Sequence, residues 1–362
     1  QLFGDQKIEQ LHFGGGTPTY FTPAQLEMLM SAICSHFPLA PDNIGEFSIE
    51  VDPRTATPER IGHLRQLGFN RLSFGVQDFD PKVQKAVHRI QTVEETQALI
   101  DAARKHEFHS VAIDLIYGLP FQNVIGFNQT LTRVIEADPD RVAIYNYAHL
   151  PHLFKPQRRI NAEDLPTPDQ KLDLLYVCIK RLTDAGYVYI GMDHFAKPDD
   201  GLAVAQRHGR LHRNFQGYST HADADLIALG VSAIGAIGPT YAQNMKTLPE
   251  YYARIDAGEL PIWRGMALTH DDLLRRTVIH TLLCHFELNK RSIEAAYPIE
   301  FDKYFASELK QLEEFAEDGL VWIDDEWITV SLRGRLLIRN IVMPFDKHLQ
   351  TKTEPMRYSR TI

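Results

Sequence analysis

The chain has 362 residues, enough for one large domain or for a large domain with a smaller one attached, and its 44% of hydrophobic residues is ordinary for a globular protein. Its formal net charge of -9, from 38 Lys and Arg against 47 Asp and Glu, argues against a nucleic-acid-binding surface, because phosphate binding needs a concentrated basic face. No stretch approaches the ~20 continuous apolar residues that cross a bilayer, and no export signal stands at the start of the chain. We therefore expect a cytoplasmic protein that binds neither nucleic acid nor membrane.

The first half of the chain alternates short β-rich segments with amphipathic helices. Helix starts are marked by Thr22 and Thr167, each followed directly by Pro and three positions on by Gln, and Gly68 and Gly186 suit helix ends. Strands that alternate with helices run parallel and are joined by right-handed crossovers, so we expect an α/β domain, either an open sheet or a barrel. The expected strands cover residues 8–13, 47–51, 71–76, 110–117, 141–148 and 187–192.

The second half of the chain has a different pattern. Residues 195–262 carry Gly, Pro and short apolar runs, which we interpret as a lid or an extension of a barrel. Beyond Trp263 the chain turns helical, with one helix expected over 300–319 and a hairpin over 320–331, an order that resembles a small winged-helix unit. The two expected domains are 1–262 and 263–362.

The three cysteines, Cys34, Cys178 and Cys284, lie too far apart in the sequence for any metal-ligand spacing and are too few for a disulfide scaffold. Cys34 and Cys178 each stand among apolar residues at helical spacing. We expect both to be small core residues.

The carboxyl ends of the expected strands are polar or rich in glycine. Open parallel sheets and barrels both place ligands at these ends. Because polar groups from at least five strands meet at one rim, a barrel or partial barrel with a deep site is favoured.

Three consecutive glycines, Gly14 to Gly16, follow the first expected strand. They lack the later glycine of the dinucleotide-binding motif and the Gly-Lys-Ser/Thr ending of a phosphate loop, so phosphate binding is not supported. A bare main chain lets amide and carbonyl groups approach a flat or charged ligand, with the Thr17 hydroxyl beside it. The alternative is a turn with a purely structural role.

Further side chains near this rim could bind a ligand. Glu50 could accept hydrogen bonds from an amine or a ribose, and the planar fork of Arg89 would suit a ligand carboxylate. Gln77 and Asp114 could recognise hydroxyl or amide groups. Arg89 could equally be a surface residue at a helix end, and for Asp52 helix capping or ion pairing is the preferred interpretation.

A later segment gathers Asp193, His194, Lys197, His212 and Arg213. The Asp-His pair suggests proton transfer or the binding of an acidic group. Metal binding is poorly supported, because no second pair with metal-ligand spacing accompanies it. The alternative interpretation is that these histidines are ordinary surface residues.

Several long strings together resemble one family: the radical S-adenosylmethionine enzymes and, within them, the oxygen-independent coproporphyrinogen III oxidases. The resemblance runs over essentially the whole chain. It implies a partial (β/α)6-type barrel that lacks its first strand and helix, with a mainly helical, winged-helix-like C-terminal domain over the substrate. The strings are LHFGGGTPTY, SIEVDPR, FNRLSFGVQDF, IDLIYGLP, YNYAHLP, GMDHFAKPDDGLAVAQ, LHRNFQGY and RGRLLIRNI.

The resemblance also implies the chemistry: two molecules of S-adenosylmethionine, a [4Fe-4S] cluster and an electron donor for it. A 5′-deoxyadenosyl radical would take a hydrogen from the β-carbon of a propionate, and loss of carbon dioxide and one electron would leave a vinyl group. Two rounds convert coproporphyrinogen III to protoporphyrinogen IX in haem biosynthesis. The cofactor positions of the family map onto Gly15, Gly16, Thr17, Glu50, Gln77, Arg89, Asp114, Ala148 and Ile234.

An acidic tetrapyrrole needs cationic groups around it. His194, Lys197 and Arg213, with Asp193 beside them, are therefore the expected substrate contacts, and Arg89 would pair with a methionyl carboxylate. We expect a monomer.

One family feature is missing: the C-x-x-x-C-x-x-C loop that binds the cluster does not occur in residues 1–362. Because thiolates are its ligands, we expect that this chain alone cannot start the radical reaction. The sequence is interpreted as a fragment that begins after the first strand, and a natural cluster-free homologue is the alternative.

Two other functions stay open on the sequence. A haem chaperone shares the cofactor core, although GMDHFA and HRNFQGY look like the oxidase. An ordinary barrel lyase or aldolase could use Asp193 and His194 as acid and base.

Overall fold

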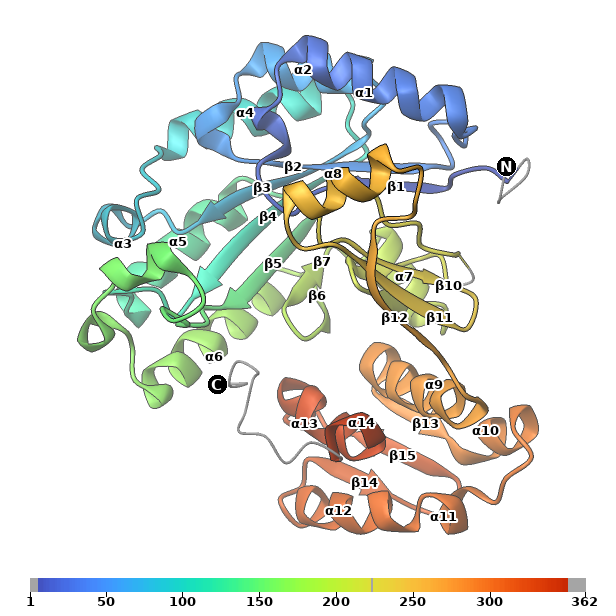
Figure 1. Ribbon diagram of the computed structural model, residues 1–362. Helices are drawn as coiled ribbons and strands as arrows, with labels where there is room; N and C mark the ends of the chain where they lie inside the picture. The colour runs from blue at the N-terminus through green and yellow to red at the C-terminus, as the bar shows by residue number, and fades with distance from the viewer. Residues whose placement is uncertain (1–5, 223, 351–362) are drawn as a thin grey trace.

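The computed structural model describes residues 6–222 and 224–350. Its largest element is a curved seven-stranded sheet, with α1, α2 and α4 along its outer side and the C-terminal domain below it (Figure 1). The strand order is β1-β2-β3-β4-β5-β7-β6, and β1 to β5 are all parallel. This confirms the expected partial barrel. The first five strands are β1 (Gln10–Phe13), β2 (Glu46–Val51), β3 (Arg71–Gln77), β4 (Ser110–Tyr117) and β5 (Arg141–Asn146).

The helices of this part begin where the sequence places their caps. Thr22 and Thr167 each form a capping box with the glutamine three residues on, and Gly68 and Gly186 follow helices with φ of 98° and 91°. In the described part of the chain, no helix is both long and apolar enough to cross a membrane. The helices are α1 (Pro23–His36), α2 (Pro58–Gln66), α3 (Pro81–Ala86), α4 (Val93–Lys105), α5 (Val124–Glu136) and α6 (Pro168–Asp184).

Alternation along the strands gives the sheet two different faces. On β2, Phe47, Ile49 and Val51 are buried against the helices, and the residues between them point to the inner face. This inner face is largely polar, so the barrel interior suits a polar ligand. Its side chains are Gln10 and His12 on β1, Glu46, Ser48 and Glu50 on β2, Arg71, Ser73 and Gln77 on β3, Asp114 on β4, and Arg141 and Tyr145 on β5.

The expected strand over 187–192 does not pack directly against β5. Residues Gly191 and Met192, with φ of 142° and 51°, reverse the chain, so β6 (Val188–Gly191) and β7 (His194–Ala196) form a hairpin. It is β7 that pairs with β5, in the antiparallel sense. The expectation that consecutive strands stay parallel is wrong here, because this tight turn leaves no room for a crossover helix.

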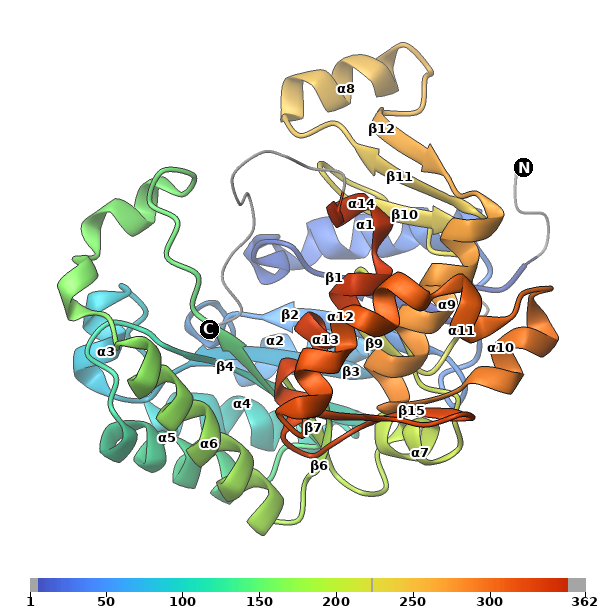
Figure 2. The same ribbon diagram turned by 90° about the horizontal axis from the view of Figure 1, so that it is seen from below.

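The region expected to be irregular, 195–262, contains the helices α7 and α8 and the short strands β8 to β11, and β12 begins at its end. Figure 2 shows α8, β11 and β12 projecting away from the large sheet. Every residue of β12 is exposed and no residue of α8 is buried, so these elements add little to the apolar core of the protein. The elements are α7 (Gly201–Arg207), β8 (His212–Asn214), β9 (Gly217–Ser219), β10 (Ile234–Ile237), β11 (Thr240–Asn244), α8 (Leu248–Asp256) and β12 (Ile262–Ala267).

The C-terminal part has the expected order of helices and a hairpin, but the helix expected over 300–319 is broken. Phe305 ends α11, because its fully buried ring packs between Phe301 and Phe345 at centroid distances of 4.9 and 5.4 Å. The elements are α9 (His270–His285), β13 (Glu287–Asn289), α10 (Lys290–Ala296), α11 (Phe301–Tyr304), α12 (Ala306–Glu317), β14 (Val321–Ile323), β15 (Trp327–Val330), α13 (Ile338–Val342) and α14 (Lys347–Gln350).

The C-terminal domain contacts the barrel at the β6–β7 hairpin. Tyr189 and Met192 of the hairpin pack against the apolar core of the C-terminal domain. Gly191 permits this approach, since a Cβ there would lie 2.4 Å from the Tyr218 hydroxyl and 3.0 Å from the Phe286 ring. The hairpin is therefore held from both sides.

Of the two cysteines expected in the core, Cys178 is buried and Cys34 is exposed. The prediction for Cys34 is wrong. Leu26, Met30 and Ile33 form the buried stripe of α1, and the next position along the helix turns about 100° away from it.

Candidate functional site

The glycine loop directly after β1 leaves bare main chain at the rim of the inner face. A Cβ on Gly14 would lie 2.5 Å from His12 Nε2 and 2.6 Å from Glu50 Oε1. The amide of Gly15, which has a φ of 86°, donates a hydrogen bond of 3.2 Å to Glu50 Oε2. A Cβ on Gly15 or Gly16 would meet nothing within 4 Å, so the main chain there is open to a ligand.

Carboxylates from two neighbouring strands face this loop. Glu50 lies 3.5 Å from His12 Nε2, and Asp114 accepts a hydrogen bond of 2.7 Å from the Ser73 hydroxyl. Burial raises the pKa of Asp114 to about 6, and the negative charge of Glu50 adds to the shift. An acidic inner face of this kind suits a ligand that carries positive charge.

Gln77 and Arg89 meet above Gly75. A Cβ on Gly75 would lie 3.0 Å from Gln77 Nε2 and 3.4 Å from Arg89 Nη2. Arg89 Nη2 donates to the Gly75 carbonyl at 3.0 Å and lies 3.3 Å from Asp52 Oδ2. Arg89 is thus turned toward the strand ends, and burial lowers the pKa of its guanidinium.

The preferred interpretation of Asp52, helix capping or ion pairing, is confirmed. Its carboxylate accepts a hydrogen bond from the amide of Arg54 at a 3₁₀-helix start and pairs with the Arg54 guanidinium at 2.6 Å. It also anchors Arg89, which gives Asp52 a role in placing that side chain.

The last two expected cofactor positions lie outside the strands of the large sheet. Ala148 stands in the segment after β5, where its carbonyl accepts a hydrogen bond of 3.0 Å from Gln157 Nε2. Ile234 starts β10, in the three-stranded sheet. Thr17 precedes the 3₁₀ helix Pro18–Tyr20 and makes no side-chain cap to it.

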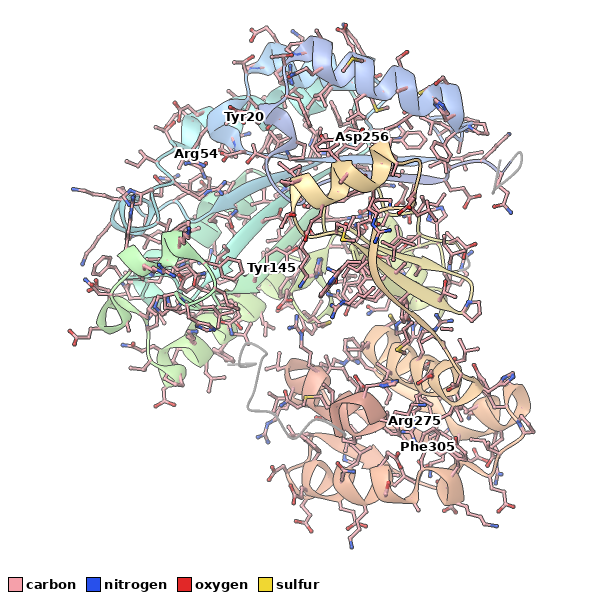
Figure 3. All side chains as sticks on the ribbon, in the orientation of Figure 1. Tyr20, Arg54, Tyr145, Asp256, Arg275 and Phe305 are labelled. Carbon is pink, nitrogen blue, oxygen red and sulfur yellow. The ribbon has the colours of Figure 1, made fainter. Side chains whose placement is uncertain are left out.

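Tyr145 was missed by sequence analysis. It lies on the inner face of β5, between the large sheet and the three-stranded sheet (Figure 3), and it is 40% exposed. Burial nevertheless raises the pKa of its phenol, with contributions from the charges of Asp114 and Asp193, and Arg213 acts in the opposite sense. Tyr145 therefore lies between the carboxylates of Glu50 and Asp114 and the cluster around His194. Side chains alternate along a strand, so Tyr145 and Ala143 share one face of β5, and this pattern is the signal that could have found Tyr145.

His194 and its neighbours form that later cluster. The ring of His194 packs edge-on against Tyr145 and Tyr218, at centroid distances of 5.9 and 5.3 Å. Burial, and then the nearby positive charge of Arg213, lower the pKa of His194 to about 3, so the ring is neutral at physiological pH. Asp193 pairs with Arg339 at 3.0 Å, and burial raises its pKa. Arg339 and Tyr218 are further members that sequence analysis missed.

Lys197 does not lie with this cluster. Because β7 runs antiparallel to β5, the residue after Ala196 emerges at the amino ends of the strands. There Lys197 pairs with Asp138 at 2.8 Å. The structure therefore separates Lys197 from the other expected substrate contacts.

A layer of ion pairs, also missed by sequence analysis, closes the amino end of the barrel. Arg71 pairs with Glu46 at 2.8 Å, and Arg141 pairs with Asp200 at 2.9 Å. Gln10 donates a hydrogen bond to Glu46. Ligands can therefore be expected only at the opposite, carboxyl end.

The inner face fits S-adenosylmethionine, whose sulfonium and amine carry positive charge and whose ribose offers hydroxyls. The cysteines do not fit an iron–sulfur cluster. Cys34, Cys178 and Cys284 lie on α1, α6 and α9, and residues 6–222 and 224–350 hold no group of three His, Cys, Asp or Glu that could bind a metal ion.

Comparisons with known proteins point the same way. The family model "Radical SAM superfamily" matches residues 1–134, and "HemN C-terminal domain" matches residues 268–337. The chain is 52% identical over 361 residues to the oxygen-independent coproporphyrinogen III oxidase of Pseudomonas aeruginosa, covering 100% of this chain and 78% of the relative. The oxidase of the same name from Synechocystis is 46% identical over 359 residues, covering 98% of this chain and 77% of the relative.

The structural comparison extends this similarity to the fold. A solved structure of the Escherichia coli coproporphyrinogen III oxidase, described as a radical SAM enzyme, superimposes with a TM-score of 0.93 at 52% identity. The match covers 96% of this chain and 80% of that chain.

Proposed function

Because the chain belongs to the family of oxygen-independent coproporphyrinogen III oxidases, we propose that it serves the anaerobic oxidative decarboxylation of coproporphyrinogen III in haem biosynthesis. Two propionate side chains would become vinyl groups, each losing carbon dioxide, one hydrogen atom and one electron, to give protoporphyrinogen IX. The chain is thus assigned to the oxidoreductases of the radical SAM superfamily. The observation that carries this proposal is the convergence of the bare glycine loop with Glu50 and Asp114 on one inner face.

The cofactor supplies the abstraction of a hydrogen atom from the substrate. In our proposal Gly15, Gly16 and Thr17 lie along its methionyl part, where the open main chain leaves room. Glu50 and Asp114 accept hydrogen bonds from its amine or ribose.

The remaining cofactor positions complete the proposed S-adenosylmethionine site, which we call the cradle. Arg89, held by Asp52 and next to Gln77, would bind the methionyl carboxylate. Ala148 and Ile234 would contact the cofactor from the segment after β5 and from the three-stranded sheet. We also propose that two molecules of S-adenosylmethionine bind, as the family resemblance implies.

On the substrate side, Asp193, His194 and Arg213 would contact an acidic tetrapyrrole, and Lys197 is left out because of its place at the other end of the strands. The proposal also includes two domains: a barrel with its extension in residues 1–262, and a C-terminal domain in 263–362 that covers the substrate. It further includes a monomeric state, a cytoplasmic location and an electron donor for the cluster.

Two other functions are less well supported. The relatives carry the oxidase name, which does not favour the haem chaperone. A lyase or aldolase would need Asp193 and His194 as an acid–base pair, whereas Asp193 pairs with Arg339, and burial and nearby arginines lower the pKa of His194 to about 3, which makes it a weak base.

Binding of S-adenosylmethionine to the 362-residue chain tests this proposal without any need for a cluster. In calorimetric titrations we expect Glu50→Gln and Asp114→Asn each to raise the Kd about tenfold or more, because each removes a charged hydrogen-bond acceptor. Glu136→Gln is the matched control, since Glu136 is an exposed residue of α5 paired with Arg133. Unchanged affinity in both site variants, or no binding by the unsubstituted chain, would overturn the cradle.

The cysteine positions give a second expected result. We expect reconstitution of the 362-residue chain with iron and sulfide to give no [4Fe-4S] spectrum, because its three thiols lie on separate helices. A cluster spectrum together with cofactor cleavage would contradict this.

A further inference from the structure

Two buried nitrogen atoms beside the β6–β7 hairpin have no hydrogen-bond partner in the described part of the chain. They are Nδ1 of His194 and Nη1 of Arg213. Buried polar groups in folded proteins are nearly always paired, because an unpaired one costs free energy. Two such atoms in one place indicate a site that the polar atoms of a ligand complete.

The two side chains share one aromatic neighbour. The His194 ring lies 5.3 Å from the Tyr218 ring, and the guanidinium carbon of Arg213 lies 4.7 Å from the centre of the same ring. This cation–π contact holds the guanidinium over the Tyr218 ring. Arg213 is therefore oriented by its surroundings although one of its nitrogens has no partner.

A second guanidinium reaches the same place from the C-terminal domain. Arg339 of α13 donates a hydrogen bond of 3.0 Å to Asp193 Oδ2, across the domain contact. The positive charges of Arg339 and Arg213 both act on Asp193 and on Tyr218. Both arginines thus belong to one electrostatic neighbourhood.

The charges in this neighbourhood do not balance. Asp193 is one carboxylate for the guanidinium groups of Arg213 and Arg339. Arg141, whose charge also acts on His194, is already paired with Asp200 at 2.9 Å. The side chain of Arg339 is 49% exposed, so an anionic ligand can reach it. An added carboxylate would neutralise the excess positive charge.

We propose that Arg213 and Arg339 form a carboxylate subsite that binds one propionate group of the tetrapyrrole, with His194 beside it. This inference rests on the proposed function, which supplies the tetrapyrrole. Guanidinium forks match a carboxylate with two parallel hydrogen bonds. Because one arginine comes from the barrel extension and the other from the C-terminal domain, the subsite exists only when that domain is docked.

The subsite is adjacent to the cofactor cradle. Tyr145 packs against His194 at 5.9 Å, and the charges of both Asp114 and Arg213 act on its phenol. A propionate held by Arg213 would therefore lie near Tyr145, next to the cradle.

Titration with coproporphyrin III, followed by porphyrin fluorescence, tests the subsite. We expect Arg213→Gln and Arg339→Gln each to weaken binding about tenfold to a hundredfold, because each removes a charge-assisted bond. The tetramethyl ester of the same porphyrin, which has no carboxylate, should bind all variants alike. Arg133→Gln is the matched control, since Arg133 lies exposed on α5 with its own carboxylate partner.

Two further measurements separate the possible failures. Thermal unfolding and S-adenosylmethionine titration should be unchanged in Arg213→Gln, which shows that fold and cradle are intact. Unchanged coproporphyrin affinity in both arginine variants, or an equal loss for the ester, would overturn the subsite while leaving the proposed function in place. No binding of coproporphyrin III by the unsubstituted chain would overturn the substrate assignment itself, and the subsite with it.

Discussion

Strands β2 and β12 have the same length, six residues each, but bury very different amounts of side chain. On β2 every second residue is buried against the helices, whereas every residue of β12 is exposed. The large sheet is therefore held by an apolar core, and the three-stranded sheet mainly by backbone hydrogen bonds and turns. The cradle thus has one rigid wall, the half barrel, and one weakly packed wall, the extension.

The largest effect that tests this comparison comes from one substitution made in both strands. Ile49 of β2 is fully buried and Ile262 of β12 is 39% exposed. We expect Ile49→Ala to lower the free energy of unfolding by about 2–5 kcal/mol, because it leaves a cavity in the core. We expect Ile262→Ala to change it by less than about 1 kcal/mol. Urea denaturation measures both, and equal losses would show that the extension has a core of its own.

Substitution of one glycine in each region compares their contributions to cofactor binding. Gly15 and Gly238 both have positive φ, 86° and 49°, and a Cβ at either position meets nothing within 4 Å. Alanine should therefore cost each about 1–2 kcal/mol of stability through backbone strain alone. Only Gly15→Ala should also weaken S-adenosylmethionine binding, by about tenfold, because its methyl group would occupy the ligand's place. An equal loss of affinity in Gly238→Ala would remove the distinction.

The smallest expected effect is a pH dependence of cofactor binding that arises in the rigid wall alone. The pKa of Asp114 is raised from 3.8 to about 6, mainly by burial and then by the charge of Glu50; Ser73 and His12 act in the opposite sense, and Tyr145 faces it from β5. The ionised carboxylate therefore costs the fold stability above pH 6, and this cost disappears as the pH falls below about 4. The ionised carboxylate favours binding of a cationic cofactor, so the affinity for the cofactor changes with pH in the opposite direction to the stability of the fold.

Affinity for S-adenosylmethionine should therefore rise a few-fold between pH 5 and pH 7, as Asp114 ionises, and then level off. Calorimetry in buffers of different ionisation enthalpy would show proton release on binding near pH 6. In Asp114→Asn the pH dependence should disappear. A dependence that persists in this variant would assign the effect to another group.

The rigid wall is also the part that the sequence predicts best. Capping boxes at Thr22 and Thr167 and the alternation of β2 are local signals, so helices, strands and the polar rim could be found without a structure. Cys34 shows the limit of this reasoning. Apolar neighbours in the sequence do not show whether a residue at the edge of the buried stripe of a helix faces the core or the solvent.

Only part of the candidate site is predicted from the sequence, because the rest depends on contacts between segments that are distant in sequence. Glu50 and Gln77 stand at strand ends and were found there, and Arg89, which follows α3, was found because its planar fork suits a ligand carboxylate. Arg339 joins the site only through the docking of the C-terminal domain, and Lys197 leaves it only because β7 reverses direction. Both outcomes depend on contacts distant in sequence, which no local pattern encodes.

Nuclear magnetic resonance of the glycine amides would show directly whether the bare main chain after β1 binds S-adenosylmethionine. With 15N-labelled glycine, we expect that adding the cofactor shifts the amide signals of Gly15 and Gly16, while that of Gly238 stays in place. Shifts confined to the extension, with the signals of Gly15 and Gly16 unchanged at saturating cofactor, would contradict it.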